Sequence, residues 1–230
     1  MNHYSLRIMK LLAIDTSTEA CSAALSFDDQ VLSRYKLAPR KHTELILPMI
    51  DDLVKEADLS VTQLDGLAFG RGPGAFTGVR IATGVIQGIA FGADLPVAPV
   101  SSLAALAQGC WRDHKAKKVI SAIDARMNEV YWGYYQLENS LMTSCVEEGI
   151  CAADQVPLPE GDDWYGAGTG WESYADLLAS RLEGKISATS PQSYPHAIDI
   201  IDLAKRIFDQ GKAVSAEQVS PVYLRDNVVG

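Results

Sequence analysis

The sequence predicts an α/β protein of two related lobes, each with strands and helices in the order βββαβαβα. Strand-length apolar runs alternate with helical segments through the first half of the chain. A strand–turn–strand pattern that begins Ala-Ile-Asp also occurs twice, as AIDTSTEACSAAL at residues 13–25 and AIDARMNEVYWGYY at residues 122–135. Such a repeat is typical of a duplicated unit. We therefore expect an N-terminal lobe over residues 9–113, a reduced C-terminal lobe over residues 114–230, and an N-terminal extension over residues 1–8.

The first lobe is predicted to begin with three strands. The run LRIMKLLAID ends at Asp15, ACSAALSF follows the turn TSTE, and VLSRYKL comes third. A helix over residues 43–57 follows, with Thr43 as its cap and apolar residues on two neighbouring stripes. The strand GLAFG, the glycine-rich segment GRGPGAFTGVR, a helix from about Phe76 to Phe91, the strand LPVAPV and the helix SSLAALAQGCW complete the lobe.

The second lobe has weaker signals after Gln136. WYGAGTGW is expected to form a strand and a glycine turn, and ESYADLLASRL is expected to form a helix. PHAIDIIDLAKRIFDQGK predicts another helix, from near Pro195 to Gly211. We therefore expect this lobe to be shorter and less regular than the first.

Composition and charge favour a soluble cytoplasmic protein. Hydrophobic residues make up 47% and charged residues 21% of the chain, as in ordinary globular proteins. The net charge of −9 argues against stand-alone nucleic-acid binding, which depends on Lys and Arg neutralising phosphates. The four cysteines form no CxxC pair. Residues 75–93 are apolar, but Arg80, Gln87 and several glycines make them a poor membrane span.

The glycine-rich segment at residues 70–80 matches neither common phosphate-binding motif. A P-loop requires a lysine, and none occurs between Lys55 and Lys115. The spacing G-x-G-x-x-G is absent as well. Two interpretations remain: a tight turn into a close-packed helix, or a weak phosphate or carboxylate site at the helix start, aided by Arg71 or Arg80.

Catalytic and metal-binding patterns are missing from the sequence. Its four histidines form no HExxH or HxxxH motif, and there is no G-x-S-x-G elbow, so we expect no metal centre and no peptidase activity. Asp15 and Asp124 differ from the other acids because both stand at strand ends that would face a cleft between the lobes. They could bind a metal-nucleotide, or each could cap the turn that follows it.

Three glycines in the second predicted helix point to a protein interface. Gly84, Gly88 and Gly92 recur every four residues, although an interior glycine costs about 1 kcal/mol relative to alanine. At this spacing they lie on one helix face and allow another backbone to approach closely. The helix over residues 43–57 also has more than one apolar stripe. Together the two helices predict a helix-on-helix interface.

These motifs together resemble the TsaB (YeaZ) family, in order and over nearly the whole chain from Met9. The segments that carry the resemblance are AIDTSTEACSAAL, HTELILPMI, GRGPGAFTGVRIATGVIQGIA, DARMNEVYWGYY, GTGW and PVYLR. The resemblance implies the actin-like ATPase (ASKHA) fold, with two βββαβαβα-type lobes of which the second is reduced. It also implies a non-catalytic scaffold subunit for making N6-threonylcarbamoyladenosine at adenosine 37 of tRNAs that read ANN codons.

The resemblance further implies partners and an interface. The family binds the transferase TsaD and works with the ATPase TsaE, forms a homodimer when TsaD is absent, and meets tRNA only through the complex. No tightly bound cofactor is implied, although ATP or ADP could bind at the TsaD interface. The implied interface residues are Leu45, Met49, Phe76, Val79, Arg80, Thr83, Gly84, Gln87 and Gly88.

Catalysis by this chain is not implied. TsaD holds its metal with two histidines, and Ser102 and Leu106 occupy the matching positions here. The first phosphate loop of the fold usually reads D-x-G-[ST], whereas Ser17 stands in place of the glycine. Asp15, Thr16, Ser17 and Asp124 remain weak candidates for nucleotide contact. The alternative function is therefore a small actin-fold ATPase or small-molecule kinase that uses Asp15 and Asp124.

Overall fold

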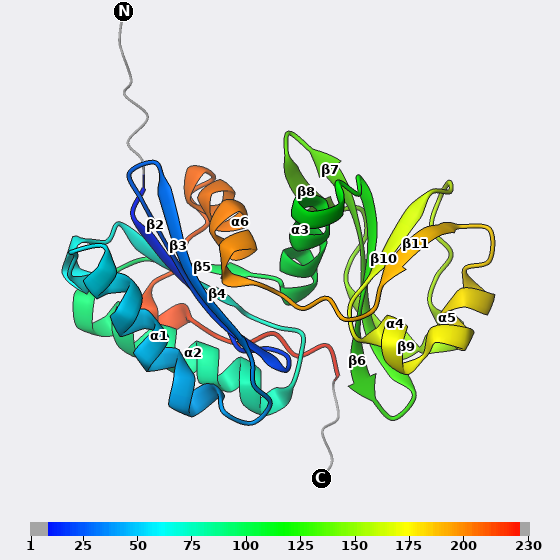
Figure 1. The fold of residues 1–230 in the computed structure, drawn as a ribbon, viewed down its shortest axis with the longest axis horizontal. Coiled ribbons are helices and arrows are strands. Elements are labelled where there is room, and N and C mark those ends of the chain that lie inside the picture. Colours follow the sequence, from blue (N-terminus) through cyan, green and yellow to red (C-terminus); the bar gives the residue numbers. More distant parts are fainter. Residues whose placement is uncertain (1–8, 226–230) are drawn as a thin grey trace, which may run out of the picture.

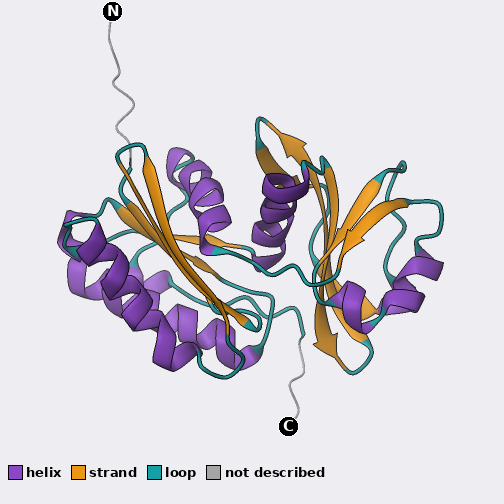
Figure 2. Ribbon diagram, in the orientation of Figure 1, coloured by secondary structure: helices purple, strands orange, loops and turns teal. Residues whose placement is uncertain are grey.

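The structure is a computed structural model that describes residues 9–225. The extension predicted over residues 1–8 lies outside the described residues. The chain forms two α/β halves that lie side by side (Figure 1). Each half is built around its own β-sheet, with helices against the sheet faces (Figure 2).

The first sheet has the strand order β3-β2-β1-β4-β5. The strands β1, β2 and β3 are antiparallel to one another, whereas β4 runs parallel to β1 and β5 runs parallel to β4. The strand bounds are Leu11–Asp15 for β1, Ala20–Phe27 for β2, Gln30–Leu37 for β3, Gly66–Gly70 for β4 and Val97–Val100 for β5.

The second sheet repeats this plan, with the order β8-β7-β6-β10-β11. Here β6 has the central position that β1 has in the first sheet. The parallel and antiparallel pairings of its neighbours match those of the first sheet. The internal repeat predicted from the two Ala-Ile-Asp segments is therefore confirmed, as is the duplicated actin-like ATPase fold. The bounds are Lys118–Arg126 for β6, Glu129–Glu138 for β7, Leu141–Ser144 for β8, Trp164–Ala167 for β10 and Ile186–Ser190 for β11; a further strand, β9 (Gly149–Ala152), pairs with β7.

The helices show how the second half is reduced. In the place of α1, between β8 and β10, it has only β9 and a 3₁₀ turn at Ala153–Gln155. The cap predicted at Thr43 is wrong, because α1 begins at His42 and no side chain caps it. The helices are α1 (His42–Glu56), α2 (Phe76–Ala93), α3 (Ser102–His114), α4 (Gly170–Ser173), α5 (Ala175–Arg181) and α6 (Ala197–Asp209), with further 3₁₀ turns at Val61–Gln63 and Ala216–Gln218.

Strand β1 contributes to the core on both faces of the first sheet. Leu12 and Ile14 pack among residues of α1 and α2, whereas Leu11 and Ala13 pack among residues of α6. All four side chains are fully buried. The uninterrupted apolar run of this strand follows from its position at the centre of a sheet covered on both sides.

Helices α3 and α6 each pack against the sheet of the half that they do not follow in the chain. Although α3 follows the first sheet in the chain, its Leu103 and Leu106 pack with Val119 and Ile123 of the second sheet. Conversely, α6 follows the second sheet but packs on the first. The two helices touch each other between the sheets (Figure 1). The predicted lobe boundary at residue 113 stays a prediction. The exchanged positions of α3 and α6 mean that the two halves share an extensive packed contact.

Helix α2 is, within residues 9–225, the one helix long and apolar enough to cross a membrane by length and composition. It packs on β1 and β4 of the first sheet. Ala82, Ile86 and Ala90 lie in the core there. A helix that covers a sheet passes the same test of length and composition.

Candidate functional site

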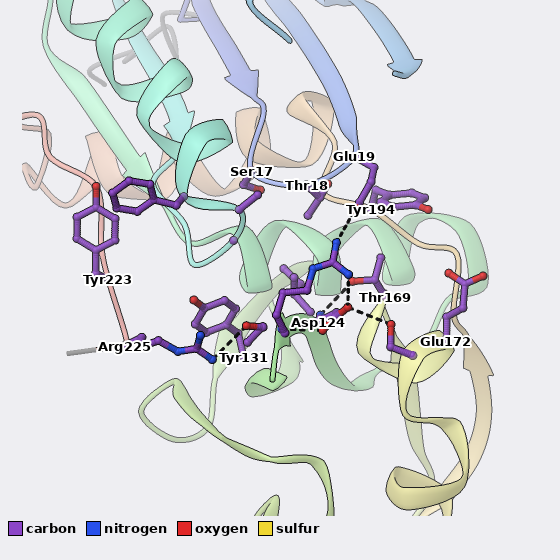
Figure 3. Close-up of a pocket in the computed structure, with 17 residues that line it drawn as sticks. Ser17, Thr18, Glu19, Asp124, Tyr131, Thr169, Glu172, Tyr194, Tyr223 and Arg225 are labelled. Atoms are coloured by element: carbon purple, nitrogen blue, oxygen red, sulfur yellow. Dashed lines mark hydrogen bonds and ion pairs between the residues drawn. The ribbon is translucent and has the colours of Figure 1, made fainter. Parts of the chain in front are cut away.

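A cavity of about 460 Å³ lies between the two halves, at the carboxyl ends of β1 and β6 (Figure 3). β1 and β6 are the equivalent central strands of the two sheets, and ligand sites in α/β folds lie at the carboxyl ends of such strands. The lining combines hydroxyls, both signs of charge and aromatic rings. It includes Ser17, Thr18, Glu19, Phe76, Asp124, Arg126, Tyr131, Thr169, Glu172, Ser173, Tyr194, Tyr223 and Arg225.

Asp124 lines this cavity, and both oxygens of its carboxylate accept hydrogen bonds from other groups of the chain. Oδ1 accepts hydrogen bonds from the backbone N–H of Arg126 at 2.8 Å and from the Tyr174 hydroxyl at 3.0 Å. Oδ2 accepts from Arg126 Nη1 at 3.1 Å and from the Ser173 hydroxyl at 3.2 Å. The backbone N–H of Asp124 donates to Thr169 Oγ1 at 3.1 Å. The turn-capping interpretation is therefore confirmed for Asp124.

Asp15 occupies the equivalent position in the first half, but it is fully buried and does not line the cavity. Its Oδ1 accepts from the backbone N–H and the hydroxyl of Ser17, both at 2.9 Å, so it also caps its turn. Its Oδ2 lies beside the buried hydroxyl of Ser102, and within residues 9–225 neither atom has another hydrogen-bond partner. Burial raises the pKa of the Asp15 carboxyl to about 6, against the opposing effect of the bonds from Ser17.

The turn after Asp15 is fastened to the start of α2. The Thr16 hydroxyl donates to the carbonyl of Gly78 at 2.6 Å, and the N–H of Ala75 donates to the carbonyl of Ser17 at 2.7 Å. A Cβ at Gly74 would stand 2.2 Å from Ser17 O, and one at Gly78 would stand 2.0 Å from Thr16 O. The glycines therefore allow two backbones to meet. This contact supports the interpretation of residues 70–80 as a tight turn into a close-packed helix.

The C-terminal tail joins the two halves beside the cavity. Tyr223 accepts a hydrogen bond from Arg80 Nε at 2.9 Å. The Arg80 guanidinium lies 3.8 Å from the ring centroid of Phe76, close enough for a cation–π contact. Two residues further on, Arg225 forms an ion pair with Glu129 of β7. The tail thus connects α2 of the first half to the second half (Figure 3).

The outer face of α2, with α1 beside it, is the second candidate site. Within the described part of the chain, a Cβ added at Gly84, Gly88 or Gly92 would meet no atom within 4 Å. Large apolar side chains are exposed on the same pair of helices. The exposed fractions are 75% for Phe91, 54% for Leu47 and 44% for Phe76.

The interface residues expected from the sequence separate into three groups by their exposure. Met49, Val79 and Thr83 are buried in this chain, and so they offer little surface to a partner. Gln87 is half-buried and donates through Nε2 to the carbonyl of Ala216 at 3.0 Å. Of the others, Leu45 is half-buried, and Phe76, Arg80, Gly84 and Gly88 are exposed.

The four candidates for nucleotide contact separate as well. Ser17 and Asp124 line the cavity between the halves, whereas Asp15 and Thr16 are fully buried beneath it. Sequence reasoning missed Glu19, Arg126, Tyr131, Tyr194 and Arg225 as cavity residues. Arg126 and Arg225 lie in quoted segments, DARMNEVYWGYY and PVYLR, whereas Tyr194 carried no signal.

The positions that match the metal-binding histidines lie in the core. Ser102 and Leu106 are one turn apart on α3 and are both buried. Leu106 packs in the apolar cluster of the second half. Within residues 9–225, no group of three or more His, Cys, Asp or Glu side chains is arranged to hold a metal ion.

Comparison with known proteins gives consistent matches. Residues 35–229 match the family model described as "TsaD: tRNA N6-adenosine threonylcarbamoyltransferase". The chain is 44% identical over 225 residues to "tRNA threonylcarbamoyladenosine biosynthesis protein TsaB" of Escherichia coli (strain K12), with 96% of each chain covered. It is 42% identical over 229 residues to the protein of the same name from Haemophilus influenzae, covering 96% of this chain and 95% of that one. The solved structure of "YeaZ from Pseudomonas aeruginosa" is 47% identical, with a TM-score of 0.89, and the match covers 94% of this chain and 100% of that one.

Proposed function

The chain belongs to the TsaB family, and on that basis we propose that it is a non-catalytic partner subunit in the synthesis of N6-threonylcarbamoyladenosine on tRNA. In this proposal it binds the transferase TsaD, together with the ATPase TsaE, while the threonylcarbamoyl group is transferred to adenosine 37 of ANN-decoding tRNAs. It works in the cytoplasm and meets tRNA through the complex.

The open glycine stripe of α2 carries this proposal. Gly84, Gly88 and Gly92 leave the helix backbone bare, with no atom of residues 9–225 within 4 Å of a Cβ placed there. Three interior glycines cost helix stability, about 1 kcal/mol each relative to alanine. Among the residues that the structure describes, none packs against the stripe to offset that cost. A partner helix that approaches the bare backbone closely would offset it.

The surroundings of the stripe suit a helical partner. Phe76, Phe91 and Leu47 present exposed apolar surface on α1 and α2, and the two helices lie side by side on the first sheet (Figure 1). Between Leu67 and Ala93 the only charged residues are Arg71 and Arg80. In the proposal, TsaD covers this face with its own pair of helices. A second copy of the chain covers it when TsaD is absent.

Three features of the two halves support a non-catalytic role. Asp15 is out of reach of the cavity, and both carboxylate oxygens of Asp124 are already engaged. Ser102 and Leu106, which match the metal-binding histidines of TsaD, cannot replace an imidazole ligand. We propose that the chain holds no cofactor tightly by itself, and that ATP or ADP binds where the chain meets TsaD.

A second function, a small ATPase or kinase, is favoured only by the cavity between the halves. At about 460 Å³ it has the size of a small-molecule site, and Asp124 lines it. Measuring ATP turnover by the purified chain separates the two functions. Turnover that disappears in Asp124→Asn would favour the enzyme.

The mass of the chain in solution, measured by light scattering, tests the main proposal. We expect a homodimer for the chain alone and a 1:1 complex after mixing with TsaD, with and without ATP. A chain that stays monomeric and forms no complex with TsaD, either with or without ATP, would overturn the proposal.

A further inference from the structure

Arg80 is the one charged residue among the 18 residues of α2. It is exposed, and within residues 9–225 it forms no ion pair. Phe76 lies four residues before it, and Gly84 and Gly88 lie four and eight residues after it. Residues at this spacing form one row along the surface of a helix. The unpaired cation therefore lies in the same row as the open glycine backbone.

Two aromatic residues hold the guanidinium of Arg80 in place. Its Cζ lies 3.8 Å from the ring centroid of Phe76 and 5.9 Å from that of Tyr223, and the two ring centroids are 5.6 Å apart. The Tyr223 hydroxyl accepts a hydrogen bond from Nε at 2.9 Å. Within residues 9–225, Nη1 and Nη2 donate to no acceptor. The side chain is thus held while its two terminal nitrogens stay free to donate.

The segment that carries Tyr223 is itself anchored on both sides of that residue. The N–H of Val222 donates to the carbonyl of Arg71 at 2.9 Å. Arg225 donates through Nη2 to the carbonyl of Ala125 at 3.1 Å. Tyr223 lies between these anchors, at the edge of the cavity between the halves (Figure 3). A side chain that is ordered before binding loses less conformational entropy when a partner contacts it, so this arrangement favours binding through Arg80.

A partner that covers this face would separate the cation from water. Removing a charged group from water is costly unless an opposite charge or a hydrogen-bond acceptor replaces the water. Helix α2 contains no acidic residue that could do so. A guanidinium with two free terminal nitrogens matches the two oxygens of a carboxylate. A partner that covers the glycine row therefore has to bring an anion to Arg80.

We propose that the protein partner that covers α2 places an aspartate or glutamate carboxylate on Arg80. The carboxylate accepts hydrogen bonds from Nη1 and Nη2, while Phe76 and Tyr223 hold the guanidinium in position. Tyr223 is a positioning residue in this contact, so the partner face continues from α2 onto the C-terminal tail. The contact also selects against partners that present a cation or only apolar groups at this point. This inference rests on the proposed function, because it specifies the chemistry of the partner at the same face.

Affinity for TsaD, measured by titration calorimetry with the full chain, tests the contact. Arg80→Gln should bind about 30-fold more weakly, since the partner's carboxylate then loses its counter-charge. Arg80→Glu should bind more weakly still, because two carboxylates then face each other. Lys117→Glu makes the same change of charge at an exposed position before β6, and it should bind as the unchanged chain does. Equal binding by Arg80→Gln and Arg80→Glu would show that no carboxylate faces Arg80 and would overturn the proposal.

A reversal of both charges identifies the carboxylate. Each exposed Asp or Glu on the TsaD helices that face α2 is replaced by Arg, and each of these TsaD variants is mixed with Arg80→Glu. One of them should bind Arg80→Glu about tenfold more tightly than unchanged TsaD does, because the opposite charges then meet again. The same TsaD variant should bind the unchanged chain more weakly. If no TsaD variant restores binding, the proposal is overturned.

Tyr223→Phe tests the positioning role, because it removes the acceptor hydroxyl and keeps the ring. In the unchanged chain it should weaken TsaD binding about threefold. In the Arg80→Gln background it should have no further effect, since the hydroxyl acts through the guanidinium. Equal losses in both backgrounds would show that the hydroxyl does not act through Arg80, and would overturn this part of the proposal.

Binding of TsaD by the unchanged chain separates this inference from the proposed function. If the unchanged chain does not bind TsaD at all, the proposed function and the carboxylate contact are both overturned. If it binds TsaD and Arg80→Gln binds equally well, the proposed function stands and the carboxylate contact alone is overturned. A loss confined to self-association of the chain would assign the carboxylate to a second copy, which would also overturn the proposal.

Discussion

In the first sheet, the carboxylate of Asp15 lies against the α-carbon of Gly70 on the neighbouring strand. A Cβ at Gly70 would stand 1.8 Å from Asp15 Oδ2 and 2.9 Å from its Cγ. The carboxylate cannot easily move away, because Oδ1 holds the turn through Ser17. The position of the Asp15 side chain therefore requires a residue without a side chain at position 70.

Gly70→Ala should lower the free energy of unfolding by about 2–3 kcal/mol, because the methyl group has no room beside the Asp15 carboxylate. Urea denaturation measures the change. Gly84→Ala is the matched control, since a methyl group there meets no atom of the described residues within 4 Å. The control should stabilise α2 by up to about 1 kcal/mol. Equal effects of the two changes would contradict the packing described here.

Asp15→Asn should stabilise the chain in a pH-dependent way. Burial raises the pKa of Asp15 from 3.8 to about 6. The folded chain then binds more protons than the unfolded chain between these pH values, and stability falls as the pH rises through this window. The asparagine avoids the buried charge, so the variant should be more stable than the unchanged chain by up to about 3 kcal/mol near pH 8.

The difference between Asp15→Asn and the unchanged chain should shrink as the pH falls to about 4, because the aspartic acid is then protonated as well. Urea denaturation at several pH values gives this difference. A constant difference across the range would show that the Asp15 charge is not responsible. Partner binding should stay nearly intact in the variant, since Asp15 reaches no surface.

Gly84→Leu should prevent association without unfolding the chain. The leucine has room in the monomer but blocks the close approach of a second helix backbone. Light scattering should give a monomer, while the far-UV circular dichroism spectrum stays that of the folded chain. Ala179→Leu is the control, because it places an exposed leucine on α5 of the other half. Loss of association in both variants, or loss of the folded spectrum in Gly84→Leu, would argue against the α2 interface.

Arg112→Leu should destabilise the chain most at high pH. Arg112 on α3 holds the buried carboxylate of Asp199 on α6 through Nε at 3.0 Å and Nη2 at 3.1 Å. Burial raises the pKa of Asp199 to about 7, although Arg112 opposes the shift. Without the arginine, the ionised acid would be buried and unpaired, at a cost of about 3–5 kcal/mol near pH 8.

The same variant should recover stability as the pH falls, and the recovery should begin above pH 7, because loss of Arg112 raises the pKa of Asp199 further and lets the acid take up a proton instead of keeping a buried charge. Adding Asp199→Asn should restore most of the loss at high pH. Thermal unfolding of the single and double variants measures both effects. If the double variant is no more stable than Arg112→Leu, the contact between α3 and α6 depends on packing rather than on this ion pair.

The sequence alone predicted most elements of the fold and its duplication. Strand β4 coincides with the predicted GLAFG segment, and α2 begins at Phe76 as expected. These are local signals, since strand-length apolar runs and glycine-rich turns act over a few residues. The repeat was visible because Asp15 and Asp124 cap equivalent turns, and each turn needs a short acceptor side chain at that position.

Only the tertiary structure decided which of these residues are available for function. Helix α2 is apolar nearly all round, so its periodicity cannot indicate which face is buried. Packing on β1 and β4 buries Val79 and Thr83 and leaves Gly84 and Gly88 exposed. Long-range contacts likewise separate Asp15, buried beneath Gly70, from Asp124 at the cavity. The crossing of α3 and α6 brings together Arg112 and Asp199, which are far apart in the chain. The sequence thus determined the elements, and packing between distant segments determined which side chains remain free to bind.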